Sequence, residues 1–336
     1  MGSFGPQRLA AAEGARRSEE ANEPTKDAAQ RLRIGVVGTG SLGRHHVRIL
    51  ASLPGVELVG IVDSRTEIAE ALAAEHGTVV LPSLEALADL AQAAVVAVPT
   101  VAHAEIGCFL ARRGLHLMVE KPIAASLAEA DELIASAEAA GKVLAVGHVE
   151  FHNPAVQALS GIGVPPRFVE IERLGVFSPR SLDVDVVLDL MIHDLQILHA
   201  LDPSPVAEVR ATGISVLSPK IDIANARIEL ASGCVANLTA SRVSAERARK
   251  LRAFLPSRYY SLDYQAQEIK GYRLIDEGGE RRIQKDDLAV EKAEPLKCEL
   301  EAFVADCRAP EAARSVSGRQ GRRALESALA VVAAIG

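Results

Sequence analysis

Short apolar runs alternate with amphipathic stretches of helical spacing between residues 33 and 148. The apolar runs span residues 34–37, 56–62, 79–81, 94–98, 115–119 and 143–146, and the helical stretches span 42–53, 66–75, 84–90, 103–112 and 127–140. Strands that are apolar throughout and separated by helices are typical of a parallel sheet covered on both faces. Because crossovers between parallel strands are right-handed, the sequence predicts an α/β fold with a doubly wound parallel sheet.

The alternation ends after residue 148, and a different pattern follows. Helices are expected from Asn153-Pro154 onward and over 186–201, 295–308 and 321–335, and extended segments over 167–174, 206–216, 221–230, 234–243, 250–255 and 259–263. Several of these segments alternate apolar and polar residues, which is typical of an antiparallel sheet with one solvent-facing side. We therefore predict a tail over residues 1–30, the parallel-sheet domain over 31–150, and an α+β domain with a mostly antiparallel open sheet over 151–336. Its last helix is able to pack back on the first domain.

A glycine-rich loop, Gly38-Thr39-Gly40-Ser41-Leu42-Gly43, joins the first apolar run to the first helical stretch. In such a loop the first glycine permits a tight turn, the second lets the backbone approach a pyrophosphate, and the third lets the helix pack closely on the strand. Phosphates then lie at the free N–H groups of the helix N-terminus. A merely structural turn is the alternative, but the strand, the helix and a suitably placed acid all favour a Rossmann dinucleotide site.

Asp63 is that acid, because it follows the second apolar run. A carboxylate there can accept hydrogen bonds from both hydroxyls of an adenosine ribose. Its charge repels a 2′-phosphate, which favours NAD over NADP. Arg65 keeps NADP open, although a solvated cation at the start of a helix is the simpler interpretation.

Composition excludes several classes of protein. The 336 residues are 49% hydrophobic and 24% charged, which suffices for two packed cores. A net charge of −7, 3% aromatic residues and no tryptophan argue against nucleic-acid binding. We find neither a membrane-spanning apolar run nor a secretory signal. The cysteines are scattered and fit neither disulfides nor zinc; they are Cys108, Cys234, Cys298 and Cys307. We therefore predict a cytoplasmic protein that binds no nucleic acid, membrane or metal.

Two further motifs, Glu120-Lys121-Pro122 and Gly147-His148, follow the fifth and sixth apolar runs, where ligands of an open α/β sheet bind. Other motifs are His46 after the glycine loop, Asp189 with His193 on one long helix, and the element 316–322. Together these motifs are similar to those of the Gfo/Idh/MocA family of sugar and polyol dehydrogenases. The resemblance extends over residues 33–335 and implies an NAD-dependent oxidoreductase, with NADP less favoured.

Within that family the chain is similar to the branch encoded with lipid A genes. The distinctive strings are Val98-Pro99-Thr100 and the segments 153–156, 185–194, 222–229 and 233–243. The best-understood members of that branch oxidise the 3-hydroxyl of UDP-N-acetylglucosamine and pass the 3-keto sugar to an aminotransferase. One departure stands out: Glu150-Phe151-His152 replaces the usual Glu-Arg-Phe, so a cation is missing unless His152 replaces it.

Oxidation of a secondary alcohol needs a base for the hydroxyl proton and a donor that stabilises the developing alkoxide. The resemblance implies that Lys121 is the donor, on a turn like the family's cis-proline turn, that His193 is the base, and that Asp189 orients the substrate or the His193 ring. Asp189 and His193 share one face of an otherwise apolar helix. A surface pair is the alternative, but polar side chains on a buried helix need a reason.

The remaining candidates are contacts to cofactor and substrate. We expect cofactor contacts from Gly38, Thr39, Gly40, Ser41, Leu42, Gly43, Asp63, Arg65, Pro99, Thr100, His103, Glu120 and Lys121, with Glu120 mainly holding its turn. Weaker substrate candidates are His148, Asn153, Arg173, Arg180 and Arg242. His148 is equally a core histidine, Asn153 equally a helix cap, and the arginines equally a solvated strand face.

Other functions compatible with the resemblance are oxidation of a free sugar, inositol or another nucleotide sugar, or a catalytically inactive cofactor-sensing regulator. Retention of Lys121, Asp189 and His193 argues against an inactive protein. The family commonly assembles through its open sheet. We therefore expect a homodimer or homotetramer, with Val235, Leu238 and Val243 on the associating face.

Overall fold

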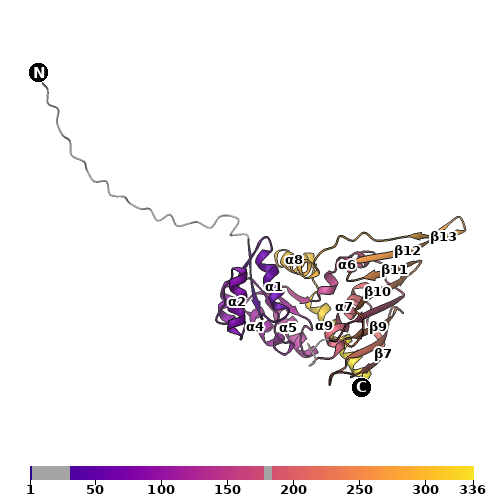
Figure 1. Ribbon diagram of the computed structural model, residues 1–336, viewed down its shortest axis with the longest axis horizontal. Helices are drawn as coiled ribbons and strands as arrows, with labels where there is room; N and C mark the ends of the chain where they lie inside the picture. Colours follow the sequence, from indigo (N-terminus) through magenta and orange to yellow (C-terminus); the bar gives the residue numbers. More distant parts are fainter. Residues whose placement is uncertain (2–30, 178–183) are drawn as a thin grey trace. The chain divides into compact units, whose positions relative to one another are not determined.

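The computed structural model describes residue 1, residues 31–177 and residues 184–336. Within these ranges, apolar segments of the first half form a five-stranded parallel sheet of order β2-β1-β3-β4-β5. The strands are β1 (Leu32–Val37), β2 (Val56–Val62), β3 (Ala93–Val96), β4 (His116–Glu120) and β5 (Leu144–Gly147). The helices between them are α1 (Gly43–Ser52), α2 (Thr66–His76), α3 (Leu84–Leu90), α4 (His103–Arg112) and α5 (Leu127–Ala139) (Figure 1). The predicted doubly wound sheet is confirmed.

Local sequence explains where several of these helices begin and end. Ser126 and Glu129 form a reciprocal capping box at the start of α5, and Ser83 caps α3. Helix α2 ends at Gly77, whose φ of 65° lies in the left-handed region that glycine tolerates. The predicted strand over 79–81 is wrong. In that run only Val80 pairs with the edge strand β2, through an isolated bridge to Ile61. The residues beside Val80 do not extend this bridge into a strand.

The second half forms an eight-stranded sheet of order β13-β12-β11-β10-β6-β9-β8-β7, antiparallel except where β6 meets β9. Its strands are β6 (Phe168–Leu174), β7 (Val206–Ile214), β8 (Ile223–Leu230), β9 (Val235–Ser241), β10 (Ala248–Leu255), β11 (Arg258–Asp263), β12 (Glu268–Glu277) and β13 (Glu280–Lys285). Burial alternates along β8, as the sequence pattern predicts. The mostly antiparallel open sheet is therefore confirmed.

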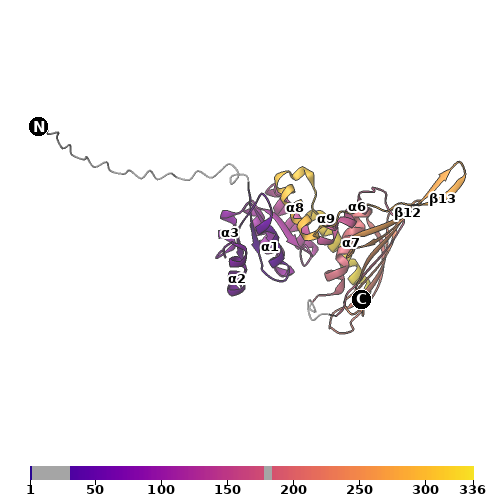
Figure 2. The same ribbon diagram turned by 45° about the horizontal axis from the view of Figure 1, so that its top comes forward.

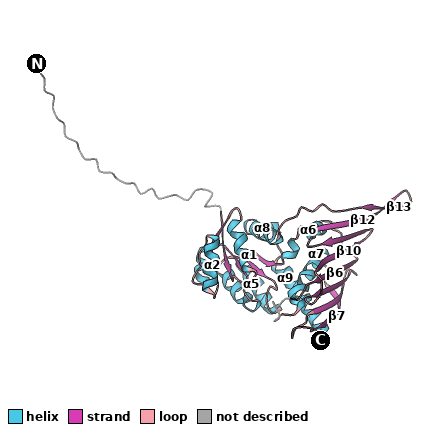
Figure 3. Ribbon diagram, viewed as in Figure 1, coloured by secondary structure: helices cyan, strands magenta, loops and turns pink. Residues whose placement is uncertain are grey.

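One face of this large sheet is covered by helices (Figures 2 and 3). These are α6 (Pro154–Ser160), the π-helical turn η4 (Val187–Met191), α7 (Ile192–Leu201) and α9 (Gly318–Ile335). The placement of Leu238 on the open face is wrong, because Leu238 is fully buried whereas Val235 is only half-buried. Residues an odd number apart along a strand point to opposite faces, so these two cannot share one.

The hairpin of β12 and β13 was not predicted from the sequence. Every residue of β13 is exposed and four of its six residues are charged, whereas half of the residues of β12 are charged. Ile283 is 76% exposed, so β13 buries little apolar surface and lacks the alternation that reveals a half-buried strand.

The C-terminal helices connect the two sheets within residues 32–336, which form one compact unit. Helix α8 (Pro295–Arg308) packs on α1 and contributes Leu300, Phe303 and Val304 to the core of the parallel sheet. Helix α9 lies against α5 and α7, in line with the expected packing of the last helix. The boundary at residue 150 stays a prediction, and the tail predicted over 1–30 lies outside the described residues after its first. Among the described helices, none is long and apolar enough to cross a membrane.

Candidate active site

The glycine loop follows β1 and leaves room above its backbone. Gly38 has a φ of +91°, and a Cβ on Gly43 would collide with the carbonyl oxygen of Gly38. At Gly40 the nearest atom to an added Cβ is a guanidinium nitrogen of Arg65, 3.9 Å away. Gly38 and Gly43 therefore shape the turn, while the open side of Gly40 fits the close approach of a pyrophosphate.

A cleft of about 880 Å³ opens at the carboxyl ends of the parallel strands. Of the predicted cofactor residues it is lined by Gly38, Gly40, Ser41, Leu42, Asp63, Arg65, Pro99, Glu120 and Lys121. Thr39, Gly43, Thr100 and His103 lie outside this lining. A cleft at this edge, on a glycine loop and beside an acid, fits a dinucleotide.

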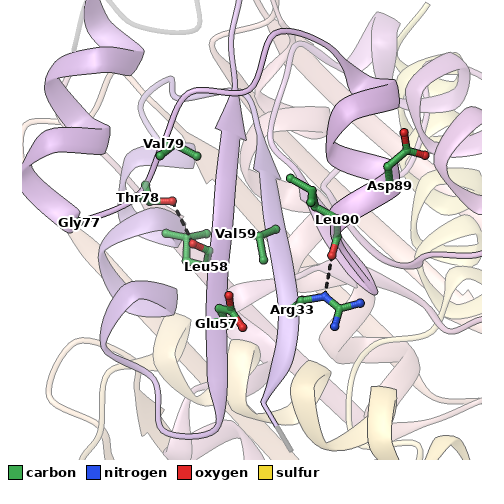
Figure 4. Close-up of a pocket in the computed structure, with 9 residues that line it drawn as sticks. All are labelled: Arg33, Glu57, Leu58, Val59, Gly77, Thr78, Val79, Asp89 and Leu90. Atoms are coloured by element: carbon green, nitrogen blue, oxygen red, sulfur yellow. Dashed lines mark hydrogen bonds between the residues drawn. The ribbon is translucent and has the colours of Figure 1, made fainter. Parts of the chain in front are cut away.

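Another hollow, of about 430 Å³, lies around the amino ends of β1 and β2 (Figure 4). Arg33 Nε donates to the Leu90 carbonyl and Thr78 Oγ1 to the Leu58 carbonyl there. It contains none of the predicted site residues, so the predicted site belongs to the opposite edge.

Asp63 is held by its neighbours on the cofactor side of β2. Its Oδ2 accepts hydrogen bonds of 2.6 Å from both the backbone N–H and the hydroxyl of Thr39. Arg65 donates to both carboxylate oxygens. Hydrogen bonds from Arg65 and Thr39 hold the pKa of Asp63 well below its usual range. Asp63 therefore carries a full negative charge at the position expected to meet the ribose.

His103 contacts the turn that carries Lys121. Its Nδ1 and Nε2 lie 2.9 Å from the carbonyl oxygens of Pro122 and Val98, respectively, and the residue is 1% exposed. The Lys121-Pro122 peptide is cis, as the resemblance implies. His103 thus braces this turn, and its contact with the cofactor stays a prediction.

Lys121 and Asp189 meet directly. Lys121 Nζ lies 3.1 Å from Oδ1 of Asp189 and 2.5 Å from its carbonyl oxygen. Asp189 lies in the π-helical turn η4, which runs directly into α7, so the predicted helix over 186–201 is confirmed. π-Helical turns are frequent at functional sites.

His193 lies one turn after Asp189 and is 8% exposed. Among the described residues its Nδ1 is buried without a hydrogen-bond partner, whereas Nε2 is the nitrogen that reaches the surface. Burial, with the charges of Lys121 and Arg173, lowers the pKa of His193 well below its usual value. The ring is therefore neutral and has a lone pair with which to accept a proton.

His148 contributes a second imidazole. Its ring is fully buried, and its centroid lies 5.6 Å from that of His193 in an edge-to-face arrangement. As far as the structure describes the chain, neither ring nitrogen has a hydrogen-bond partner. Of the two interpretations of His148, a core histidine with satisfied nitrogens does not fit.

Three of the weaker substrate candidates have partners within the protein. Asn153 caps α6 through Ala155 N–H at 3.0 Å and donates to the Tyr264 carbonyl. Arg173 is buried between Asp194 and Glu150, and Arg242 pairs with Asp222 at 2.9 Å. Arg180 lies outside the described residues.

His152 does not replace the missing cation. It is 5% exposed, and burial lowers its pKa to about 4, so the ring is neutral at pH 7.

Two charged residues near the site were not predicted. Arg249 is half-exposed and lies in register with Arg173, and both donate to Oε1 of Glu150. Glu299 on α8 is fully buried, and neither of its oxygens has a partner within the described ranges. Helical spacing could have revealed Glu299, because it lies one turn before the core residue Phe303.

Comparisons with known proteins identify the family of this chain. The family model GFO_IDH_MocA, an oxidoreductase family with an NAD-binding Rossmann fold, matches residues 32–148. UDP-N-acetylglucosamine 3-dehydrogenase of Acidithiobacillus ferrooxidans is 38% identical over 310 residues, which cover 90% of this chain and 97% of that protein. The chain belongs to the Gfo/Idh/MocA oxidoreductase family. The resemblance stated from the sequence is thus confirmed.

Solved structures place the whole described unit in the same fold. The A. ferrooxidans enzyme GnnA superposes with a TM-score of 0.84 at 37% identity, over 91% of this chain and 98% of that one. Levoglucosan dehydrogenase in complex with NADH and levoglucosan superposes with a TM-score of 0.78 at 18% identity, over 91% of this chain and 97% of that one, and shows the fold alone.

A further relative by sequence is inositol 2-dehydrogenase of Rubrobacter xylanophilus, which is 29% identical over 57% of this chain and 58% of that protein.

Proposed function

We propose that this oxidoreductase uses NAD to oxidise the 3-hydroxyl of UDP-N-acetylglucosamine to the 3-keto sugar. The observation that carries the reaction type is the meeting of Lys121 with Asp189, 3.1 Å apart, at the edge of the cofactor cleft. His193 follows on the same helix with an accessible Nε2. The substrate rests on the similarity to the A. ferrooxidans enzyme, which extends over nearly its whole length.

Residues of this chain bind the reacting oxygen and take up the proton of the sugar hydroxyl. Bound NAD supplies the hydride acceptor. The Lys121 ammonium group, held by the carbonyl and carboxylate of Asp189, donates a hydrogen bond to the reacting oxygen. Nε2 of neutral His193 accepts the hydroxyl proton as the carbon–hydrogen bond breaks and the carbonyl forms. The hydride and the proton thus leave the sugar in different directions.

NAD is proposed over NADP because the Asp63 carboxylate is ionised where a 2′-phosphate would lie. The exposed guanidinium of Arg65 is the feature that would favour NADP. Arg65 already donates from Nε and Nη2 to the Asp63 carboxylate, so these two N–H groups are engaged before a phosphate binds.

A second candidate, oxidation of a free sugar or inositol, is favoured by one observation. A diphosphate is usually bound by arginines with free N–H groups. Arg173 and Arg242 are instead paired with buried carboxylates. A neutral polyol would not require these cations.

The deciding experiment incubates the purified protein with NAD⁺ and, in parallel, UDP-N-acetylglucosamine, N-acetylglucosamine, glucose or inositol. NADH absorbance reports turnover, and mass spectrometry after trapping by an aminotransferase identifies the keto sugar. We expect turnover with the UDP sugar alone. Turnover confined to the free sugars or inositol would replace the first candidate by the second.

We also propose self-association through the open face of the large sheet. Side chains in register form an apolar row across neighbouring strands, consisting of Val235, Phe168, Phe254, Tyr259 and Tyr272. The ring centroids of Phe254 lie 5.5 Å from Phe168 and 5.0 Å from Tyr259. A half-exposed apolar row on a sheet face suits a second copy of the chain in a homodimer or homotetramer.

The proposed pathway setting follows from the product. A 3-keto nucleotide sugar is a substrate for an aminotransferase, and we propose that such an enzyme consumes it in the cytoplasm during lipid A biosynthesis.

A further inference from the structure

His148 is the residue at the site to which the proposed reaction gives no role. It follows β5 directly, at the same sheet edge as Lys121, because β4 and β5 are parallel neighbours with Glu120 opposite Gly147. The ring is fully buried and, in the part of the chain that the structure describes, both nitrogens lack partners. Leaving buried polar atoms unpaired is costly, so a packing role alone would favour an apolar side chain.

The neighbouring His193 also has a ring nitrogen without a hydrogen-bond partner in the described part of the chain. This nitrogen is the buried Nδ1. The two rings stand edge to face at 89°, with centroids 5.6 Å apart. Rotation of one ring about its Cβ–Cγ bond turns a nitrogen toward the other ring, which would satisfy both residues with one hydrogen bond.

We propose that His148 accepts a hydrogen bond from Nδ1–H of His193 and thereby fixes the tautomer in which Nε2 of His193 faces the cleft with a free lone pair. This inference rests on the proposed function, in which His193 is the base. His148 is then a positioning residue, comparable to the carboxylates and carbonyls that orient histidines at other sites.

The surroundings keep both rings in the neutral form that this arrangement needs. Burial and the Lys121 charge lower the pKa of His148 to about 3 and that of His193 well below its usual value. The charged and titratable groups acting on the pair are Lys121, His152, Arg173 and Arg249. Asp194, next to His193 in the chain, is paired with Arg173 at 2.6 Å. A neutral His148 has the lone pair that accepts the hydrogen bond.

His152 provides a matched control, because it ends the short 3-10 helix Val149–His152 that His148 precedes. It is also buried, its Nε2 has no partner among the described residues, and burial lowers its pKa. Its ring packs on Phe151, with centroids 5.2 Å apart, rather than on His193. Replacing His152 therefore disturbs this short helix without removing the proposed acceptor.

The test records long-range ¹H–¹⁵N spectra of the full chain labelled with [¹⁵N]histidine at pH 7, with His193 assigned by loss of its signals in His193→Asn. We expect His193 protonated at Nδ1 in the wild type and in His152→Phe. In His148→Phe the Nε2–H tautomer should gain population, and in His148→Gln, whose amide oxygen can accept the bond, Nδ1–H should persist. Protonation of wild-type His193 at Nε2, or an unchanged tautomer in His148→Phe, would overturn the proposal.

Kinetics add a second readout. His148→Phe should lower kcat about tenfold while leaving the KM for NAD unchanged, and His148→Gln should recover most of the loss. If His148→Phe does not fold, the wild-type tautomer and the His148→Gln spectrum still decide. Because the spectra need no turnover, inactivity toward UDP-N-acetylglucosamine with the expected tautomer would overturn the proposed function and leave the role of His148 supported.

Discussion

Nε2 of His46 lies 2.7 Å from Oε1 of Glu120, with His46 fully buried and Glu120 6% exposed. The contact joins the helix that begins at the glycine loop to the end of β4. Glu120 precedes Lys121 and also accepts a hydrogen bond from its backbone N–H at 3.3 Å. The loop expected to bind pyrophosphate and the turn that carries Lys121 are therefore held together by one buried pair.

Replacing His46 by Ala should destabilise the protein by about 3 kcal/mol, because it leaves a buried carboxylate without its partner. Urea denaturation measures the change. The exposed pair of Arg112 and Glu132 is the control, and Arg112→Ala there should cost less than about 1 kcal/mol. Equal effects of the two substitutions would show that the His46 contact contributes little.

Glu299→Gln tests the protonation of the buried carboxyl. Burial, with the charge of Glu120, raises the pKa of Glu299 well above its usual value, so the folded protein retains a proton that the unfolded chain releases. Wild-type stability should therefore fall as pH rises from the unfolded pKa toward the folded one. Glu299→Gln removes this loss, so its stability relative to wild type should grow with pH. The exposed Glu301→Gln, measured by the same denaturation series, should show no such trend.

Lys121→Ala and His193→Ala should each lower kcat by a hundredfold or more, about 2.7 kcal/mol in the barrier. The binding of NAD, measured by titration, should barely change because the glycine loop and Asp63 are intact. Asp189→Asn should be milder if Asp189 only orients Lys121. A near-normal kcat in Lys121→Ala would refute the mechanism while leaving the substrate unaffected.

Cofactor choice should depend on Asp63. NAD⁺ should bind at least about tenfold more tightly than NADP⁺, which corresponds to about 1.4 kcal/mol. Asp63→Ser should narrow this gap because it removes the charge that repels a 2′-phosphate. Fluorescence titration with both cofactors measures the two affinities. Equal affinities in the wild type would refute the assignment to NAD.

Phe254→Glu should convert the assembly to a monomer of 35.5 kDa in light scattering at micromolar concentration. The charge would be introduced into the middle of the apolar row on the open sheet face. Ile68→Glu, on the exposed side of α2, is the matched control and should leave the mass unchanged. A monomeric wild type would remove the proposed interface.

The parallel sheet was predictable because its strands are apolar along their whole length and are separated by helical spacing. The same logic failed at 79–81, since three apolar residues do not distinguish an edge segment from a strand. It also missed the β12–β13 hairpin, because β13 is exposed throughout and is defined by main-chain pairing with β12 rather than by burial. The family resemblance, rather than spacing along the chain, implied that Lys121, Asp189 and His193 act together, and the structure brings Lys121 within 3.1 Å of Asp189. The pairing of Arg173 with Asp194 depends on β6 and α7 packing together, which local sequence does not encode.

The packing of α8 has a consequence for how the protein is made. Leu300, Phe303 and Val304 belong to the core of the parallel sheet, although all five of its strands precede residue 148. During translation about 150 residues are synthesised between the last strand of the parallel sheet and these side chains of α8. The cofactor-binding half thus completes its interior only after the strands of the large sheet have been made, and a product terminated before residue 300 would expose that unfinished surface to chaperones and proteases.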